Sequence, residues 1–289
     1  MNWLMFAIGA AIFTAAAALT QKKVLNKEHA LEFSTVLAIL NFAIVFVFLP
    51  QTNFDIGWDK YLLIYGVSWF AAIAYLMVAK AARHSEISAV SPIMNFGPAI
   101  TASMAFLVLG EKISALQVAG IGLLILGMYV LEIKKDLKNF LDPFKEFVKS
   151  KYNHFIIFAL ILYGFTSIAD RYIMTHGVGV ETYQFIVHGF VLMNYLLIIT
   201  IFYDGIKGVI NGFKSAGKWI LLVSIFTVAY RYMQAKAVSM MYVGLVSAIK
   251  RLSNVVITLV GGKIYHEKNV LIKVLGCIIM IWGAVFIII

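Results

Sequence analysis

The chain has 289 residues, of which 62% are hydrophobic and only 13% are charged. A soluble domain carries about 45–50% apolar and about 25% charged residues, so this composition excludes a soluble globular enzyme and indicates an integral membrane protein. The net charge of +10 does not indicate nucleic acid binding, because so apolar a chain has little water-facing surface on which basic residues can gather.

Ten runs of about 18 to 23 mainly apolar residues, bounded by charged or turn residues, are each long enough to cross a bilayer as a helix. They cover residues 3–21, 30–49, 61–80, 87–109, 113–132, 154–174, 182–203, 217–235, 241–262 and 270–289. We therefore predict an all-α membrane protein with ten transmembrane helices. No basic segment precedes the first run and another span follows it, which predicts a membrane helix and not a cleaved signal.

The longest polar segment, residues 133–153, separates five spans from five. It contains Leu141, Phe144 and Phe147 among lysines, which favours a short interfacial helix over a flexible linker. We predict three parts: a first five-helix repeat at 1–132, a polar interfacial linker at 133–153 and a second five-helix repeat at 154–289.

The two halves resemble each other in sequence. A shift of 156 residues aligns 12 identical residues over 52 positions, among them Glu111 and Lys112 on Glu267 and Lys268. A preference for apolar residues does not explain a charged pair at a helix end. Because each half has an odd number of spans, the repeats must be inverted in the bilayer, an arrangement in which a substrate site forms between the repeats near the midplane.

The basic residues are distributed unequally between the two sides. Sixteen of the 24 Lys and Arg residues lie in or beside the loops after the odd-numbered spans, against three on the other side. The positive-inside rule then predicts that both termini lie outside the cytoplasm.

The fourth span ends with Gly110, Glu111 and Lys112 before a short glycine-containing fifth span, and residues 266–268, His-Glu-Lys, end the ninth. With five plus five spans, the chain resembles the drug/metabolite transporter superfamily, specifically two EamA-like repeats. The resemblance implies a membrane transporter, in a superfamily whose substrates include amino acids, sugar phosphates, nucleotide sugars and drugs. It also implies cytoplasmic termini, which contradicts the count of basic residues, so the orientation stays open.

Charged side chains at bilayer depth cost several kcal/mol, from ~2.5 upward, and each is therefore a functional candidate. In the ninth span, Ser247, Arg251 and Asn254 recur at helical spacing and form one polar stripe. In the eighth span, Arg231 and Gln234 share a face. We expect both stripes to face one wet cavity, with nine substrate-binding candidates: Lys250, Arg251, Arg231, Gln234, Asn254, Ser247, Asn95, Asp170 and Tyr163.

Three of these candidates come from other spans. Asn95 lies between Pro92 and Pro98 in the fourth span, where proline leaves backbone carbonyls free to line a cavity, although a static packing kink is an equal alternative. Tyr163 and Asp170 share one face of the sixth span.

The cations of the eighth and ninth spans have two interpretations. Lys250, Arg251 and Arg231 hold an anionic group, or they pair internally with Asp170 or with backbone carbonyls. The adjacent Lys250 and Arg251 are similar to the phosphate-binding pair of plastid sugar-phosphate carriers, but the fourth span has no basic residue, which argues against a sugar phosphate.

Asp170 and three further polar residues are candidates for coupling or for structure. Asp170 either couples protons or neutralises a nearby arginine, and His188 is either a proton relay or a hydrogen-bonded packing residue. We expect Glu111 and Glu267 to form a structural clasp at the helix ends, with a gate, or a cap against Lys112 and Lys268, as alternatives.

We predict a secondary transporter of a small polar, anionic or zwitterionic metabolite, working by alternating access in the plasma membrane. No cofactor, metal or nucleic acid is expected, and the partners are the substrate and the lipid bilayer. Glycines in the fifth and tenth spans allow close helix contact, within the chain or in a homodimer. The alternatives are an exporter of cationic drugs or amines, disfavoured because the first span has no acid, and an intramembrane enzyme.

Overall fold

The computed structural model describes residues 2–25, 29–84, 96–132, 151–257 and 270–288. Over these residues the secondary structure is helical and contains no strand. The helices are α1 (Asn2–Leu25), α2 (Ala30–Val45), the 3-10 helix η1 (Phe46–Gln51), α3 (Trp58–His84), α5 (Gly97–Leu109), α6 (Ala115–Glu132), α8 (Lys151–Thr175), α9 (Val180–Phe202), α10 (Ile206–Met240), α11 (Val243–Lys250) and α13 (Val270–Ile288).

Five stretches of helix are long and apolar enough to cross a bilayer: 3–21, 30–51, 58–81, 154–175 and 180–202. α10 is a sixth if its two parts, Ile206–Lys214 and Gly217–Met240, form one bent span. Shorter apolar helices occupy 97–109, 115–130 and 274–288. An all-helical, multi-pass membrane protein is therefore confirmed, and helix is found within each of the ten predicted spans, whereas ten complete crossings remain a prediction. The predicted interfacial linker, at 133–153, lies almost wholly outside the described residues.

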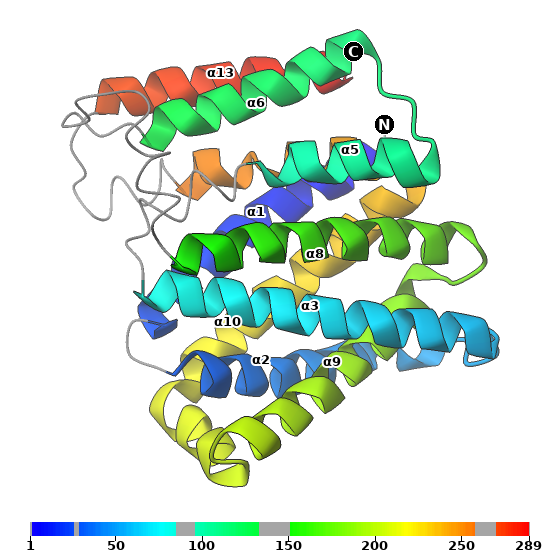
Figure 1. Ribbon diagram of the computed structural model, residues 1–289, viewed down its shortest axis with the longest axis vertical. Coiled ribbons are helices and arrows are strands. Elements are labelled where there is room, and N and C mark those ends of the chain that lie inside the picture. The colour runs from blue at the N-terminus through cyan, green and yellow to red at the C-terminus, as the bar shows by residue number, and fades with distance from the viewer. Residues whose placement is uncertain (1, 26–28, 85–95, 133–150, 258–269, 289) are drawn as a thin grey trace.

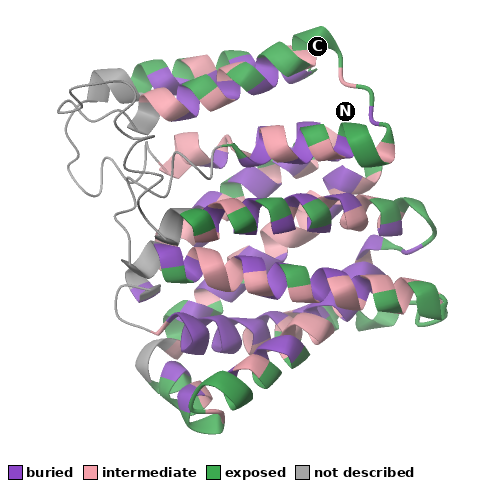
Figure 2. Cartoon of the chain, viewed as in Figure 1, coloured by how far each residue is buried: buried purple, intermediate pink, exposed green. Residues whose placement is uncertain are grey.

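The outer faces of the helices are apolar. Figure 2 shows exposed positions along the outer helices, and many of them carry large hydrophobic side chains, such as Leu107 on α5 and Phe202 on α9. Backbone groups in a helix are satisfied internally, so such a surface is stable against lipid. These faces are the expected lipid contacts of a membrane protein.

The helices pack in two groups that mix the two halves of the sequence. α1 and α2 pack against α10, and α1 also contacts α11. α3 packs against α8 and α9, and α5 packs against α8. We call these the α10 group (α1, α2, α10, α11) and the α8 group (α3, α5, α8, α9). They meet through α2 with α9 and α5 with α11, while α6 and α13 lie side by side at one edge of the molecule (Figure 1).

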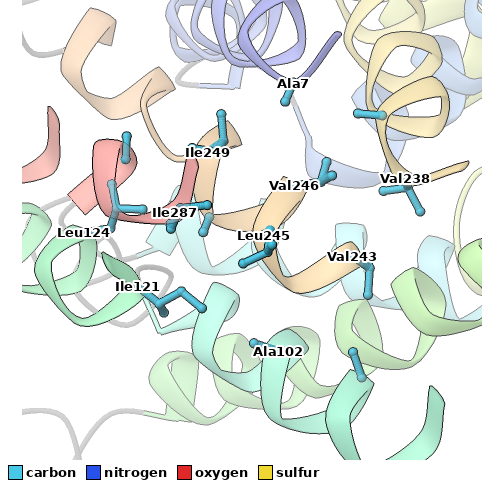
Figure 3. Close-up of a cluster of buried hydrophobic side chains, with 14 of the residues drawn as sticks. Ala7, Ala102, Ile121, Leu124, Val238, Val243, Leu245, Val246, Ile249 and Ile287 are labelled. Carbon is cyan, nitrogen blue, oxygen red and sulfur yellow. The ribbon is translucent and has the colours of Figure 1, made fainter. Parts of the chain in front are cut away.

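Helix α11 lies in the centre of the largest apolar cluster (Figure 3). Its Leu245, Val246 and Ile249 are fully buried, and they pack with side chains of α1, α5, α6, α10 and α13, such as Ala102 and Ile287. This packing holds the short helix whose last residue is Lys250. The position of that basic residue is therefore determined by the apolar core.

One buried hydrogen bond joins two helices inside each group. Ser224 Oγ of α10 donates to Asn41 Oδ1 of α2 at 2.6 Å, and Asn194 Nδ2 of α9 donates to Ser68 Oγ of α3 at 2.9 Å. Such interhelical bonds in membrane proteins contribute about 0.6 kcal/mol each on average. They tie α2 to α10 and α9 to α3.

The predicted glycine contact forms between α6 and α13 of the same chain. A Cβ atom added to Gly283 would lie 2.7 Å from the backbone oxygen of Gly120, and one added to Gly127 would lie 2.7 Å from that of Gly276. These distances are shorter than real Cβ contacts. The helices therefore approach this closely only because glycine has no side chain.

We therefore expect Gly283→Ala to lower the melting temperature of the protein in detergent, because overpacking against rigid backbone costs about 1–3 kcal/mol. Gly122→Ala on α6 is the matched control, since an added Cβ there meets nothing within 4 Å. Alanine favours a helix by about 1 kcal/mol over glycine, so the control should be unchanged or slightly stabilised. Equal melting temperatures for the two variants would contradict the close contact.

Candidate functional site

A cavity of about 320 Å³ lies between the helices, lined by residues of α1, α3, α5, α8, α9, α10 and α11 and by Arg251 and Ser253. Both helix groups contribute to its wall. Seven of the nine predicted binding residues line it: Tyr163, Asp170, Arg231, Gln234, Ser247, Lys250 and Arg251.

The polar stripe predicted along the ninth span is interrupted at Arg251. α11 ends at Lys250, and the amides of Arg251 and Leu252 bond to carbonyls only three residues earlier, Ala248 and Ile249, at 3.0 Å. Helical geometry resumes at residues 253–257. This tighter turn changes the direction of every later side chain relative to a continuous helix.

Asn254 accordingly does not line the cavity. Its Nδ2 lies 3.3 Å from the sulfur of Met128 on α6, in hydrogen-bonding geometry. Of the remaining binding candidates, Asn95 lies outside the described residues, and Pro98 belongs to the first turn of α5 and not to the middle of a helix. The spacing argument therefore holds up to Arg251 and fails beyond it.

Lys250 is held by neutral groups. Its Nζ donates to Gln234 Oε1 at 2.6 Å and lies 4.7 Å from the centre of the Tyr230 ring. Both contacts come from α10, the helix that carries Arg231. The predicted convergence of the eighth and ninth spans on one cavity is thus seen in the packing.

The two arginines of the cavity have no carboxylate within 4.0 Å among the described residues. Arg231 Nε also has no hydrogen-bond partner in that part of the chain. Asp170, the carboxylate predicted as one of their possible partners, instead accepts a hydrogen bond from the hydroxyl of Tyr183 on α9. It acts on Arg231 only through longer-range attraction. The described cavity wall therefore has more positive than negative charge.

Several tyrosines complete the wall and were missed from the sequence. Tyr75, Tyr183 and Tyr230 line the cavity from α3, α9 and α10, beside the predicted Tyr163. Gln184, one residue after Tyr183, also lines it and donates to the carbonyl oxygen of Arg231 at 3.2 Å. Aromatic residues are common throughout an apolar helix, so no sequence signal separates these three tyrosines from ordinary packing residues.

His188 lies outside the cavity wall. It is buried, and its Nδ1 bonds to the carbonyl oxygen of Gln184, one turn earlier, at 2.7 Å. This bond within one helix fits the packing interpretation. A coupling role for His188 stays a prediction.

Glu111 joins three helices at one end of the cavity. Its Oε1 accepts a hydrogen bond from the amide of Val243 at 3.0 Å and lies 3.2 Å from Nε of Arg171 on α8. Arg171 Nη1 in turn donates to the carbonyls of Val238 and, at 2.7 Å, of Met241 at the end of α10. Val238 and Val243 both line the cavity, so the pair closes directly against it.

This contact is compatible with the predicted clasp, for which the sequence named no partner. The cap against Lys112 is not formed, because the buried carboxylate of Glu111 faces Arg171, a residue that its sequence position beside Asp170 did not single out. The predicted counterpart, Glu267, lies outside the described residues. Among the residues that are described, no three His, Cys, Asp or Glu side chains gather as a metal site.

Comparison with known proteins supports this architecture. Residues 1–133 match the EamA-like transporter family, which confirms the resemblance predicted from the Gly-Glu-Lys motif. The fold matches 29 chains of solved structures, including a crystal structure with a TM-score of 0.72 and 14% sequence identity, over 96% of this chain and 94% of the other. At that identity the likeness establishes the fold alone. No curated protein sequence matches the chain.

The clasp leads to a prediction about stability. Glu111→Gln should lower the melting temperature in detergent markedly, because removing one partner of a buried ion pair costs about 3–5 kcal/mol. Lys112→Gln is the control and should leave it nearly unchanged. The double variant Glu111→Gln/Arg171→Gln should be less destabilised than the sum of the single variants. A large loss from Lys112→Gln and none from Glu111→Gln would exclude the clasp.

Proposed function

We propose that this chain is a secondary transporter that carries a small polar, anionic or zwitterionic metabolite through the central cavity by alternating access. The match of residues 1–133 to the EamA-like transporter family supports the transport of a small molecule across a membrane. The sign of the substrate's charge rests on one observation, the surplus of cations in the cavity.

The surplus consists of Arg231, Arg251 and Lys250 against Asp170. Cations at bilayer depth are costly unless they are paired, and here the carboxylate is already hydrogen-bonded to Tyr183. A bound anion offsets this cost, and a guanidinium group binds carboxylate or phosphate with two parallel hydrogen bonds. The remaining carboxylate of Asp170 suits the positive end of a zwitterion.

The packing supports two inverted five-helix repeats at 1–132 and 154–289. Exchanging each helix for its counterpart five spans away turns the contacts of α1 and α2 with α10 into the contacts of α8 and α9 with α3. The same exchange turns the contact of α5 with α8 into the contact of α11 with α1. The pairs α6–α13, α2–α9 and α5–α11 map onto themselves. Ser68 and Ser224, which make the two equivalent interhelical bonds, are separated by the same 156 residues that align the halves.

We propose that the α10 group and the α8 group move relative to one another, and not one sequence half against the other. Two charged contacts join the groups at the same end of the molecule: Glu111 and Arg171 with the end of α10, and Glu181 of α9 with Lys236 of α10 at 2.8 Å. These contacts close that end and must separate for substrate to leave by it. We retain the plasma membrane as the proposed location, and the orientation of the termini stays open, because the count of basic residues and the family resemblance favour opposite sides.

A second function also has support from the cavity. Asp170 and the rings of Tyr75, Tyr163 and Tyr230 are groups that bind organic cations, so an exporter of amines is the alternative. An intramembrane enzyme has less support, because the described lining contains one carboxylate and no histidine, and hence no pair of acids and no serine–histidine couple.

The first test is a thermal-stability screen of the purified protein in detergent against carboxylates, amino acids, phosphorylated sugars, nucleotides and quaternary amines. A ligand at 100 times its dissociation constant stabilises the folded state by about 2.7 kcal/mol. We expect an anion or zwitterion to stabilise the wild type and to lose this effect in Lys250→Ala/Arg251→Ala. Stabilisation by amines alone, equal in both proteins, would instead favour the amine exporter.

A second test addresses coupling. If Asp170 carries the coupling proton, Asp170→Asn in proteoliposomes should abolish accumulation driven by a pH gradient but keep exchange of labelled for unlabelled substrate near the wild-type rate. Tyr183→Phe, which removes only the hydroxyl that bonds to Asp170, is the companion variant. Loss of both accumulation and exchange in Asp170→Asn would assign the residue to structure.

A further inference from the structure

Helix α5 begins at the wall of the cavity, and among the described residues no side chain caps it. Its first residue, Gly97, and Pro98 both line the cavity, and the preceding Phe96 makes no side-chain hydrogen bond to the first turn. In the first turn of α5, Pro98 has no N–H and the amide of Ile100 bonds to the carbonyl of Phe96, so the donors left in the described chain are the N–H groups of Gly97 and Ala99. The helix end also carries partial positive charge, which favours an anion. By itself this end of α5 says nothing about a ligand.

A second group points to the same place. An added Cβ atom on Gly97 would lie 2.5 Å from Nη2 of Arg251 and 3.3 Å from Leu160 Cδ2, so the guanidinium occupies the space that a side chain at position 97 would need. Arg251 is half-buried on the cavity wall, and no carboxylate among the described residues is within 4.0 Å of it.

The juxtaposition is unfavourable without an anion. Cations are stabilised at the C-terminal end of a helix and not at its N-terminal end, yet the guanidinium of Arg251 lies against the first residue of α5. Both groups bind the same chemical species, an oxyanion, and a helix N-terminus is a common site for one.

We infer that the guanidinium of Arg251 and the first turn of α5 together form the subsite for the substrate's carboxylate or phosphate group, and that Gly97 determines specificity because it leaves room for the guanidinium. This inference rests on the proposed transport of an anion or zwitterion. It also gives Lys250 and Arg251 different roles, because Lys250 is bonded to Gln234 and adjacent residues of a helix point about 100° apart.

The test is the change in melting temperature produced by sodium acetate, glycine and sodium phosphate, each compared with sodium chloride at equal ionic strength. Acetate and glycine report a carboxylate subsite, and phosphate reports a phosphate subsite. In Gly97→Ala, the added methyl group displaces the guanidinium. We expect whichever of these anions stabilises the wild type to bind this variant about tenfold more weakly, since hydrogen bonds to charged groups contribute about 1.5–3 kcal/mol. Gly66→Ala on α3 is the matched control, because an added Cβ there meets nothing within 4 Å.

A second pair of variants keeps the test decisive if Gly97→Ala does not fold. Arg251→Gln should abolish the response to whichever anion stabilises the wild type, whereas Lys250→Gln should weaken it by a smaller factor, because Nζ of Lys250 is bonded to Gln234. The readout is the response to the anion and not the basal melting temperature, so a purely structural role would not reproduce this pattern.

The possible failures are distinguishable. Suppose that acetate, glycine or phosphate stabilises the wild type, and that the same probe stabilises Gly97→Ala and Gly66→Ala equally. The subsite at α5 is then excluded, while anion transport stands. An equal loss in Lys250→Gln and Arg251→Gln would likewise exclude it in favour of a paired site. If no anion stabilises the wild type and a quaternary amine does, the proposed function and the subsite are both overturned.

Discussion

The cost of placing positive charge in an apolar interior is the constraint on which the rest of this structure depends. Arg171 forms an ion pair with Glu111 and donates to two backbone carbonyls, and Lys236 forms an ion pair with Glu181. Lys250 is bonded to the neutral side chain of Gln234. Arg231 and Arg251 remain without a carboxylate within 4.0 Å in the described chain, and both line the cavity. The unpaired cations therefore indicate where a ligand completes the structure.

The paired and unpaired cations also lie in different places. The paired ones join the α10 group to the α8 group at one end of the cavity, where their contacts have to break if the groups move apart. The unpaired ones lie on the cavity wall itself. The ion pairs join the two groups at one end of the cavity, and under the proposed transport Arg231 and Arg251 are the cations that attract an anionic substrate to its wall.

Backbone interruptions position the central groups. The ninth span breaks at Arg251 and resumes at Ser253, and the shift of 156 residues aligns Ser253 with Gly97, where α5 begins. Both residues line the cavity. Periodicity assumes an unbroken helix. For this reason it predicted Ser247 and Arg251 on the cavity wall, where they lie, but also Asn254, which lies against Met128.

The sequence by itself determined the membrane class, the positions of the helices, the resemblance between the halves and most of the charged residues of the cavity. These features follow from composition, apolar run length and helical spacing, which are local properties of the chain. Only the tertiary structure decided that Glu111 pairs with Arg171, that Asp170 bonds to Tyr183 and that Arg251 lies against Gly97. Partners far apart in the sequence are selected by how the helices of both halves interleave, and no local pattern encodes that arrangement.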